Sequence, residues 1–101
     1  MIRHVTLLSF KDSFTQELVD SWSSGLTAVS KLIPGLISIT HGRDVLPNAQ
    51  PGVVTRMDYA IVIDCDSVES TQAYLTHPDH LALTKISVPN CHSIVSVDLE
   101  L

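Results

Sequence analysis

Basic side chains are scarce in this chain of 101 residues, which contains 6 lysines and arginines against 11 aspartates and glutamates. A protein that binds nucleic acid needs a cluster of basic side chains facing the phosphates, and the sequence has no such stripe. Long apolar runs are also missing, because none approaches the about 20 residues that a membrane-spanning helix requires. These absences, with a formal net charge of -5, argue against nucleic-acid and membrane partners.

Cysteine is limited to Cys65 and Cys91, which lie far apart in the sequence and form no CxxC pair. A structural zinc site is therefore not expected, and both thiols are predicted to be free and buried. The chain runs from Met1 straight into a strand-like pattern without the architecture of a signal peptide, which favours a cytoplasmic location. With 45% hydrophobic and 17% charged residues, residues 1–101 are predicted to form one globular domain.

Apolar residues recur with a period of two in some segments and with a helical period in others. The predicted strands cover residues 2–10, 36–41, 53–65 and 91–101, and the third is strongest from 59 to 65. Helices are predicted over residues 13–33, 68–75 and 78–85, with a loop over 42–52 and a turn over 88–90. The long helix is expected to begin at Ser13, which has capping-box spacing with Gln16, and to end at Pro34.

Two of these segments have predicted faces. In the long helix, one apolar stripe is formed by Phe14, Leu18, Trp22, Leu26, Val29 and Ile33. In the second strand, alternation places Ile37, Ile39 and His41 on one face.

The order of elements, β-α-β-β-α-β, is typical of an α+β ferredoxin-like fold, a four-stranded antiparallel sheet with helices on one face. The other face of this sheet would also be apolar, since it would carry Val5, Leu7, Val62, Val95 and Val97. Such a patch is too large to leave in water, and a domain of this size has no further element to cover it. We therefore expect a homodimer in which two sheets pack face to face as a dimeric α+β barrel.

The segment 73–81 concentrates groups that can move protons. It contains Tyr74, His77, Asp79 and His80 around Pro78. Proline cannot continue the first short helix but suits the first position of a new one, and it favours an extended His77. His80 is then predicted to project from the first turn of the second short helix.

Three segments carry a resemblance to a known family: residues 2–11, the Ile33-Pro34-Gly35-Leu36 turn, and the tyrosine-to-HPxH segment from Tyr74 to His80. In this order they resemble the stress-responsive dimeric α/β-barrel (Dabb) family over nearly the whole chain. The resemblance implies a ferredoxin-like protomer and a homodimer with a central barrel, in agreement with the order of elements.

The resemblance also implies roles for single residues. His80 and Tyr74 match the catalytic histidine and tyrosine of a polyketide cyclase within the family, and His4 matches a pocket histidine. The chain departs from that pattern at Tyr59, where the cyclase has a further pocket histidine. It also departs over residues 81–85, which replace a glycine-rich segment, so the shape of the pocket and the particular substrate are not carried over.

Together these residues suggest an aldol-type reaction that needs no metal or organic cofactor. His80 would remove a proton between two carbonyls, and the Tyr74 hydroxyl would donate to the developing enolate oxygen. His4 or Tyr59 would orient a small hydrophobic or polyketide-like ligand. The cavity between helices and sheet is expected to be lined by Leu8, Phe10, Trp22 and Ile61.

Other interpretations remain open at this stage. Tyr74 and His4 could be ordinary core residues, His80 could cap a helix or bond to backbone, and His77 could be a solvent-facing residue before a proline. A metal site on His77 and His80 is disfavoured because Pro78 breaks the helix on which their spacing would bring them together. The alternative functions are a non-enzymatic stress-response or ligand-binding homodimer and a cofactor-free monooxygenase, for which Trp22 is the weak indication.

Overall fold

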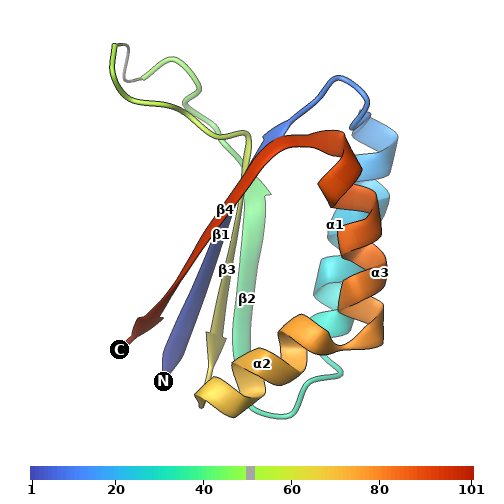
Figure 1. Cartoon of the computed structure of the whole chain (residues 1–101), viewed down its shortest axis with the longest axis vertical. Helices are drawn as coiled ribbons and strands as arrows, with labels where there is room; N and C mark the ends of the chain where they lie inside the picture. Colours follow the sequence, from blue (N-terminus) through green and yellow to red (C-terminus); the bar gives the residue numbers. More distant parts are fainter. Residues whose placement is uncertain (50–51) are drawn as a thin grey trace.

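The computed structural model describes residues 1–49 and 52–101, in which a four-stranded antiparallel sheet is covered by helices on one face (Figure 1). The chain forms, in order, β1 (Ile2–Phe10), α1 (Gln16–Ser30), β2 (Leu36–Arg43), β3 (Tyr59–Cys65), α2 (Val68–Thr76), α3 (Pro78–Ser87), a 3₁₀ turn (Val88–Asn90) and β4 (Cys91–Glu100). The strand order is β2-β3-β1-β4. This confirms the predicted ferredoxin-like fold.

Strand β1 lies between β3 and β4, and its pairing determines which side chains share a face. His4 is opposite Ile63 on β3 and Asp98 on β4, so these three point toward the helices. Val5 is opposite Val62 and Val97, so these three point the other way. The predicted common face of Val5, Leu7, Val62, Val95 and Val97 is therefore confirmed.

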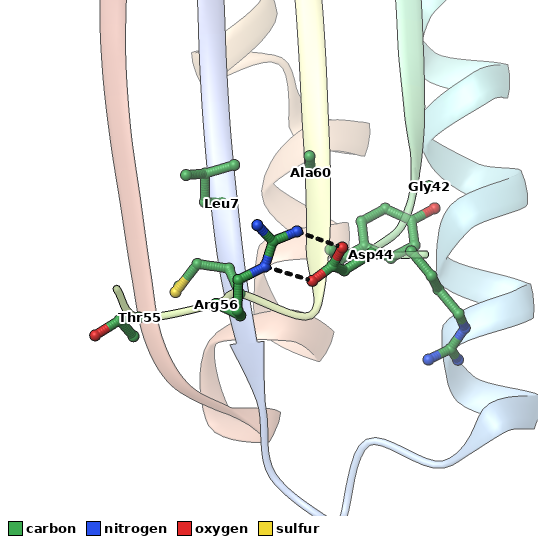
Figure 2. Close-up of a pocket in the computed structure, with 9 residues that line it drawn as sticks. Leu7, Gly42, Asp44, Thr55, Arg56 and Ala60 are labelled. Atoms are coloured by element: carbon green, nitrogen blue, oxygen red, sulfur yellow. Dashed lines mark hydrogen bonds and ion pairs between the residues drawn. The ribbon is translucent and has the colours of Figure 1, made fainter. Parts of the chain in front are cut away.

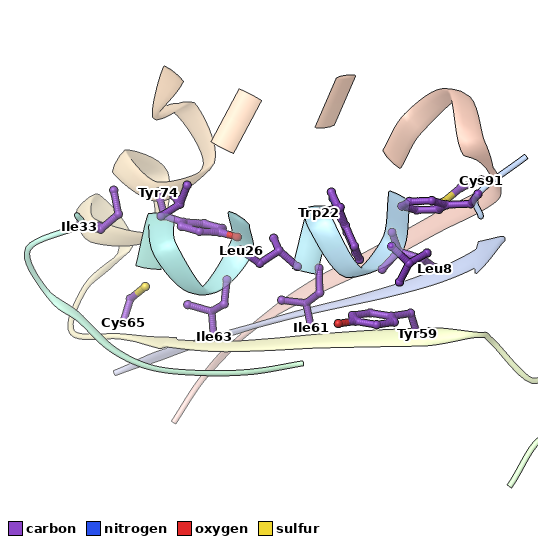
Figure 3. Packing of buried hydrophobic residues seen from close by; sticks show 13 residues of the cluster. Leu8, Trp22, Leu26, Ile33, Tyr59, Ile61, Ile63, Cys65, Tyr74 and Cys91 are labelled. Carbon is purple, nitrogen blue, oxygen red and sulfur yellow. The ribbon is translucent and has the colours of Figure 1, made fainter. Parts of the chain in front are cut away.

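The core lies between the sheet and the helices (Figure 3). Its buried apolar residues are Leu8, Phe14, Val19, Trp22, Leu26, Val29, Ile33, Tyr59, Ile61, Ile63, Cys65, Tyr74 and Cys91. Both cysteines are buried free thiols, as predicted. Packing of α3 on α1 depends on a small residue, since a Cβ on Gly25 would lie 2.6 Å from the Leu83 side chain.

Helix α1 is shorter than the predicted range 13–33. Thr15, not Ser13, caps it, and the Thr15 hydroxyl accepts a hydrogen bond from the Leu18 amide at 3.3 Å. The predicted apolar stripe is confirmed except at Leu18, which is 38% exposed, whereas Val19 is 2% exposed. The helix was predicted too long because Phe14 and Ile33 are buried core residues outside it, which extended the apparent periodicity beyond both ends.

Strand β2 differs from the prediction at both ends. A register shift between Leu36 and Ser38 places Leu36 opposite Cys65 and leaves Ile37 59% exposed, so Ile37 does not share the environment of Ile39 and His41. Such a bulge breaks the two-residue alternation from which the face was predicted. The strand also includes residues 42–43. Within the loop predicted over 42–52, residues 50–51 lie outside the described residues.

The face of the sheet opposite the helices is open. Val95, Val97 and Leu99 on β4 are 45–52% exposed, and no described element packs over them. An ion pair between Arg3 Nε and Asp64 Oδ1 at 2.8 Å lies on the same face. Across the described ranges, no helix combines the length and apolar character needed to cross a membrane.

The turn between α1 and β2 requires a glycine. Gly35 has φ of 86°, and an added Cβ would collide with Ser70 Oγ and the Asp66 carboxylate. Its carbonyl accepts a hydrogen bond from the Asp66 amide at 2.8 Å, which joins this turn to the start of α2.

We predict that Gly35→Ala lowers the free energy of unfolding by at least about 1–2 kcal/mol, because a side chain disfavours this left-handed backbone. Urea unfolding at fixed protein concentration measures the loss. Gly42→Ala is the matched control, since a Cβ added at Gly42 would meet nothing within 4 Å. Equal midpoints for the two variants would contradict the prediction.

Candidate functional site

The corner between α2 and α3 is set by His77 and Pro78. Helix α2 ends at Thr76, and His77 is extended, with φ -60° and ψ 135°. Pro78 begins α3, and His77 Nδ1 accepts a hydrogen bond from the Asp79 amide at 3.1 Å. The predicted stop and restart are confirmed, and His77 caps the second helix. Within the described ranges, no three His, Cys, Asp or Glu side chains are grouped as metal ligands.

This corner brings His80 of α3 against Tyr74 of α2. Their ring centroids are 4.4 Å apart and the ring planes are inclined by 49°. Tyr74 is 1% exposed, and Figure 3 shows its hydroxyl directed toward Leu26. No hydrogen bond joins this hydroxyl to another residue of the described chain, so the phenol proton is available to a ligand.

The tautomer of His80 follows from its backbone contact. His80 Nδ1 lies 3.0 Å from the carbonyl oxygen of Leu75, which can only accept a hydrogen bond. Nδ1 therefore carries a proton, and in the neutral ring Nε2 holds the free lone pair. Nε2 is the atom that can accept a proton from a ligand.

Burial keeps both rings neutral. It lowers the pKa of His80 below its ordinary value of 6.5. The hydrogen bond to Leu75 raises this pKa in part, and the nearby His4 and His77 lower it further. Burial also raises the pKa of Tyr74 far above its ordinary range. Near pH 7 the pair therefore consists of a neutral phenol donor and a neutral imidazole acceptor.

Both rings line a cavity of about 270 Å³ between the helices and the sheet. The cavity is polar at one end, where His4 lies opposite Asp98 and Thr6 lies opposite Ser96 in the β1–β4 register. It is apolar at the other end, where Leu8 lies opposite Ile94. Its wall is completed by Trp22, Leu26, Ile61, Leu75, Leu83, Thr84, Ser87 and Val88. The cavity can thus hold a compact apolar ligand with its polar groups at the Tyr74 end.

His4 forms the floor of the polar end and is fixed there by two hydrogen bonds. Its Nδ1 is 2.6 Å from Asp98 Oδ1, and its Nε2 is 2.9 Å from Thr6 Oγ1. Since both nitrogens are engaged, His4 is suited to holding a position in the wall. Sequence reasoning did not identify Asp98, because its contact with His4 depends on the β1–β4 register. Thr6 was missed as well, although it lies two residues from His4 on the same face of β1.

Two predicted lining residues lie elsewhere. Phe10 and Tyr59 stack on each other with centroids 5.8 Å apart, and Tyr59 packs against Trp22 at 5.1 Å. The Tyr59 hydroxyl is 2.7 Å from His41 Nδ1, which directs it toward β2. Leu8, Trp22 and Ile61 do line the cavity, so the structure brings together Tyr74, His80, His4 and these three. Phe10 and Tyr59 do not join them because Trp22 lies in contact with both, at the edge of the cavity.

A second hollow, of about 280 Å³, lies on the open face of the sheet (Figure 2). Leu7, Gly42 and Ala60 line it together with an ion pair in which Arg56 donates to Asp44 at 2.8 Å. Neither Tyr74 nor His80 reaches this face, so the cavity between the helices and the sheet is the candidate site.

Fold and site together define a ferredoxin-like protein whose helices enclose a tyrosine–histidine pair. The chain belongs to the family described as the stress-responsive A/B barrel domain (Dabb), whose model matches residues 2–101.

Relatives with this fold have varied descriptions. The chain is 26% identical to olivetolic acid cyclase of Cannabis sativa over 81 residues, 79% of this chain and 76% of that protein. It is 24% identical over 98 residues to a stress-response A/B barrel domain-containing protein of Arabidopsis thaliana, covering 96% of this chain and 86% of that one.

Solved structures with a similar fold agree with the assignment to this family. A dimeric ferredoxin-like protein of unknown function from Thermobifida fusca superposes with a TM-score of 0.82 at 31% identity, over 99% of this chain and 90% of that one. A hydroxynitrile lyase from Passiflora edulis superposes with a TM-score of 0.80 over 99% of this chain and 92% of that one. Its 20% identity shows the shared fold alone.

We predict that His80 titrates below pH 6.5 and that its neutral form carries the proton on Nδ1, because of its burial and its bond to Leu75. Long-range ¹H–¹⁵N NMR spectra over pH 4.5–8 measure both properties. Exposed His92 serves as the internal reference. A neutral form protonated on Nε2 would contradict the geometry.

The same shift predicts a stability effect. Since the folded chain binds this proton less readily than the unfolded chain, His80 makes the protein less stable as the pH falls below about 6.5. The variant His80→Gln should lose less stability than the wild type between pH 7 and 5, as urea unfolding at each pH measures. An equal loss in both proteins would contradict the prediction.

Proposed function

We propose that this protein is a cofactor-free acid–base enzyme that carries out a polyketide cyclase-like, aldol-type ring closure on a small hydrophobic carbonyl compound. One observation carries the proposal: an unpaired phenol and an imidazole with a free Nε2 share one cavity between the helices and the sheet. Here the hydroxyl and Nε2 are both left for a ligand.

The chemistry follows from the protonation states. A carbon between two carbonyls loses its proton to His80 Nε2, and the Tyr74 hydroxyl donates to the enolate oxygen as charge develops there. The carbanion carbon then forms a bond to a second carbonyl carbon of the same molecule. The resulting alkoxide takes the proton back from the His80 imidazolium, so the catalytic groups return to their starting state.

The surroundings suit each role. The Leu75 carbonyl accepts from Nδ1–H and so stabilises the imidazolium that forms after proton transfer. The apolar walls exclude water, which strengthens the hydrogen bond from Tyr74 to the enolate oxygen. His4 can orient a substrate oxygen only from its fixed place in the wall.

The comparison with a protein named as a cyclase supports ring closure as the reaction. Tyr59 does not stand in for a cavity histidine, because its hydroxyl is engaged with His41 outside the cavity. The cavity of this chain is therefore proposed to use His80 and Tyr74 as its reacting groups, with His4 held in the wall by Asp98 and Thr6.

We predict that His80→Gln and Tyr74→Phe each lower the rate of ring closure by about a hundredfold or more. A screen of linear poly-β-ketone thioesters, with products followed by mass spectrometry, measures the rate. His92→Gln is the control, because His92 is exposed on β4 and lies outside the cavity. Equal product from wild type and His80→Gln would remove His80 from the mechanism. Ligand binding without product would favour a non-enzymatic ligand-binding protein.

We also propose that the working unit is a homodimer joined through the open sheet face. The support is the exposed apolar face of Val95, Val97 and Leu99 and the description of the Thermobifida fusca relative as dimeric. Two such faces can cover each other about a twofold axis.

Sedimentation velocity tests the dimer. The wild type should sediment as a dimer at micromolar concentration, and Val97→Glu should shift it toward the monomer, because a carboxylate would be buried without a partner. Leu32→Glu, on the helix side, is the control and should leave the dimer intact. A monomeric wild type would contradict the proposed dimer and would leave the chemistry proposed for His80 unaffected.

A further inference from the structure

A groove of about 380 Å³ lies against the candidate cavity, between α2 and β4. One side is formed by Val68, Thr71 and Gln72 of α2, and the other by Asp98, Leu99 and Glu100 of β4, with Ile2 at the end of β1. Leu75 and Asp98 line both the groove and the cavity. These two side chains therefore form the partition between the polar end of the cavity and the surface.

The charge of this partition is acidic. Asp98 and Glu100 contribute two carboxylates, and no lysine or arginine is among the described residues that line either space. His4, bonded to Asp98, can offset one negative charge at most. Any ligand that passes Leu75 comes close to these carboxylates while still partly in water.

We infer that the α2–β4 groove is the outer part of the ligand site, reached past Leu75 and Asp98, and that its acidic side selects uncharged carbonyl compounds over carboxylates. The alkyl or aryl extension of the ligand lies along Ile2, Val68 and Leu75, and its carbonyl end reaches Tyr74 and His80. This inference rests on the proposed function for the position of the carbonyl. To that function it adds the route by which the ligand enters and the charge that the ligand carries.

Trp22 gives a direct readout of binding. It is the single tryptophan of the chain, it is 2% exposed, and it lines the cavity. Octanamide and octanoate are the probes, because they have the same chain length and differ in charge. Stopped-flow fluorescence of Trp22 with each probe yields the affinity and the association rate without any turnover.

The charge is tested with Asp98→Asn, which keeps an acceptor oxygen for His4 Nδ1. The wild type should prefer octanamide, and the substitution should shift the preference toward octanoate by about fivefold, the effect of one nearby charge in partly exposed surroundings. Exposed Glu17 on α1 supplies the control, and Glu17→Gln should leave the preference unchanged. An unchanged preference in Asp98→Asn would overturn selection by charge.

The route is tested with Leu75→Ala and Leu75→Phe, which should speed and slow octanamide association respectively. Val88→Phe tests the other side of the cavity, where Val88 is 60% exposed, and should leave the rate unchanged. Slowing by Val88→Phe alone would overturn the proposed route, and so would the absence of any saturable change with octanamide. Circular dichroism checks that each variant folds. None of these outcomes depends on product formation, so the activity of His80→Gln remains a separate test of the chemistry.

Discussion

The pleat of β1 is the constraint on which both faces of the molecule depend. Because successive side chains of a strand point to opposite sides, His4, Thr6 and Leu8 face the helices while Val5 and Leu7 face away. A shift of one residue in the β1–β4 register would carry the polar groups to the open face and the valines into the cavity. The register is held on both sides of β1, since its neighbours β3 and β4 both pair with it along most of its length.

Burial produces the chemistry of the site as well as the stability of the core. The packing that buries Trp22 and Leu26 of α1 also shields Tyr74 and His80 from water, and this burial keeps both of these rings uncharged. The chain has few basic residues and puts none of them in the cavity wall. An arginine or lysine there would favour a charged phenolate and would change the donor into a base.

Local patterns predicted most of the fold, and they failed where tertiary packing prevailed. The strand alternation and the break at Pro78 were predicted correctly, because each depends on neighbours in the sequence. The length of α1 was overestimated because Phe14 and Ile33 join the core from outside the helix, and Ile37 was misplaced by a bulge that leaves no mark in the pattern. Tyr74, His80 and His4 were predicted from the family resemblance. Asp98 was not, since it is 94 residues from His4 and only the sheet register joins them.

The thickness of a single strand separates the open face of the sheet from the cavity on its other face. Val97 on the open face and Asp98 on the cavity face are neighbours in the chain, yet they meet different surroundings. A substitution at Val97 therefore changes the open face, and a substitution at Asp98 changes the wall of the cavity. Along β4 the lining of the cavity can thus be altered at every second position while the intervening positions leave the open face unchanged.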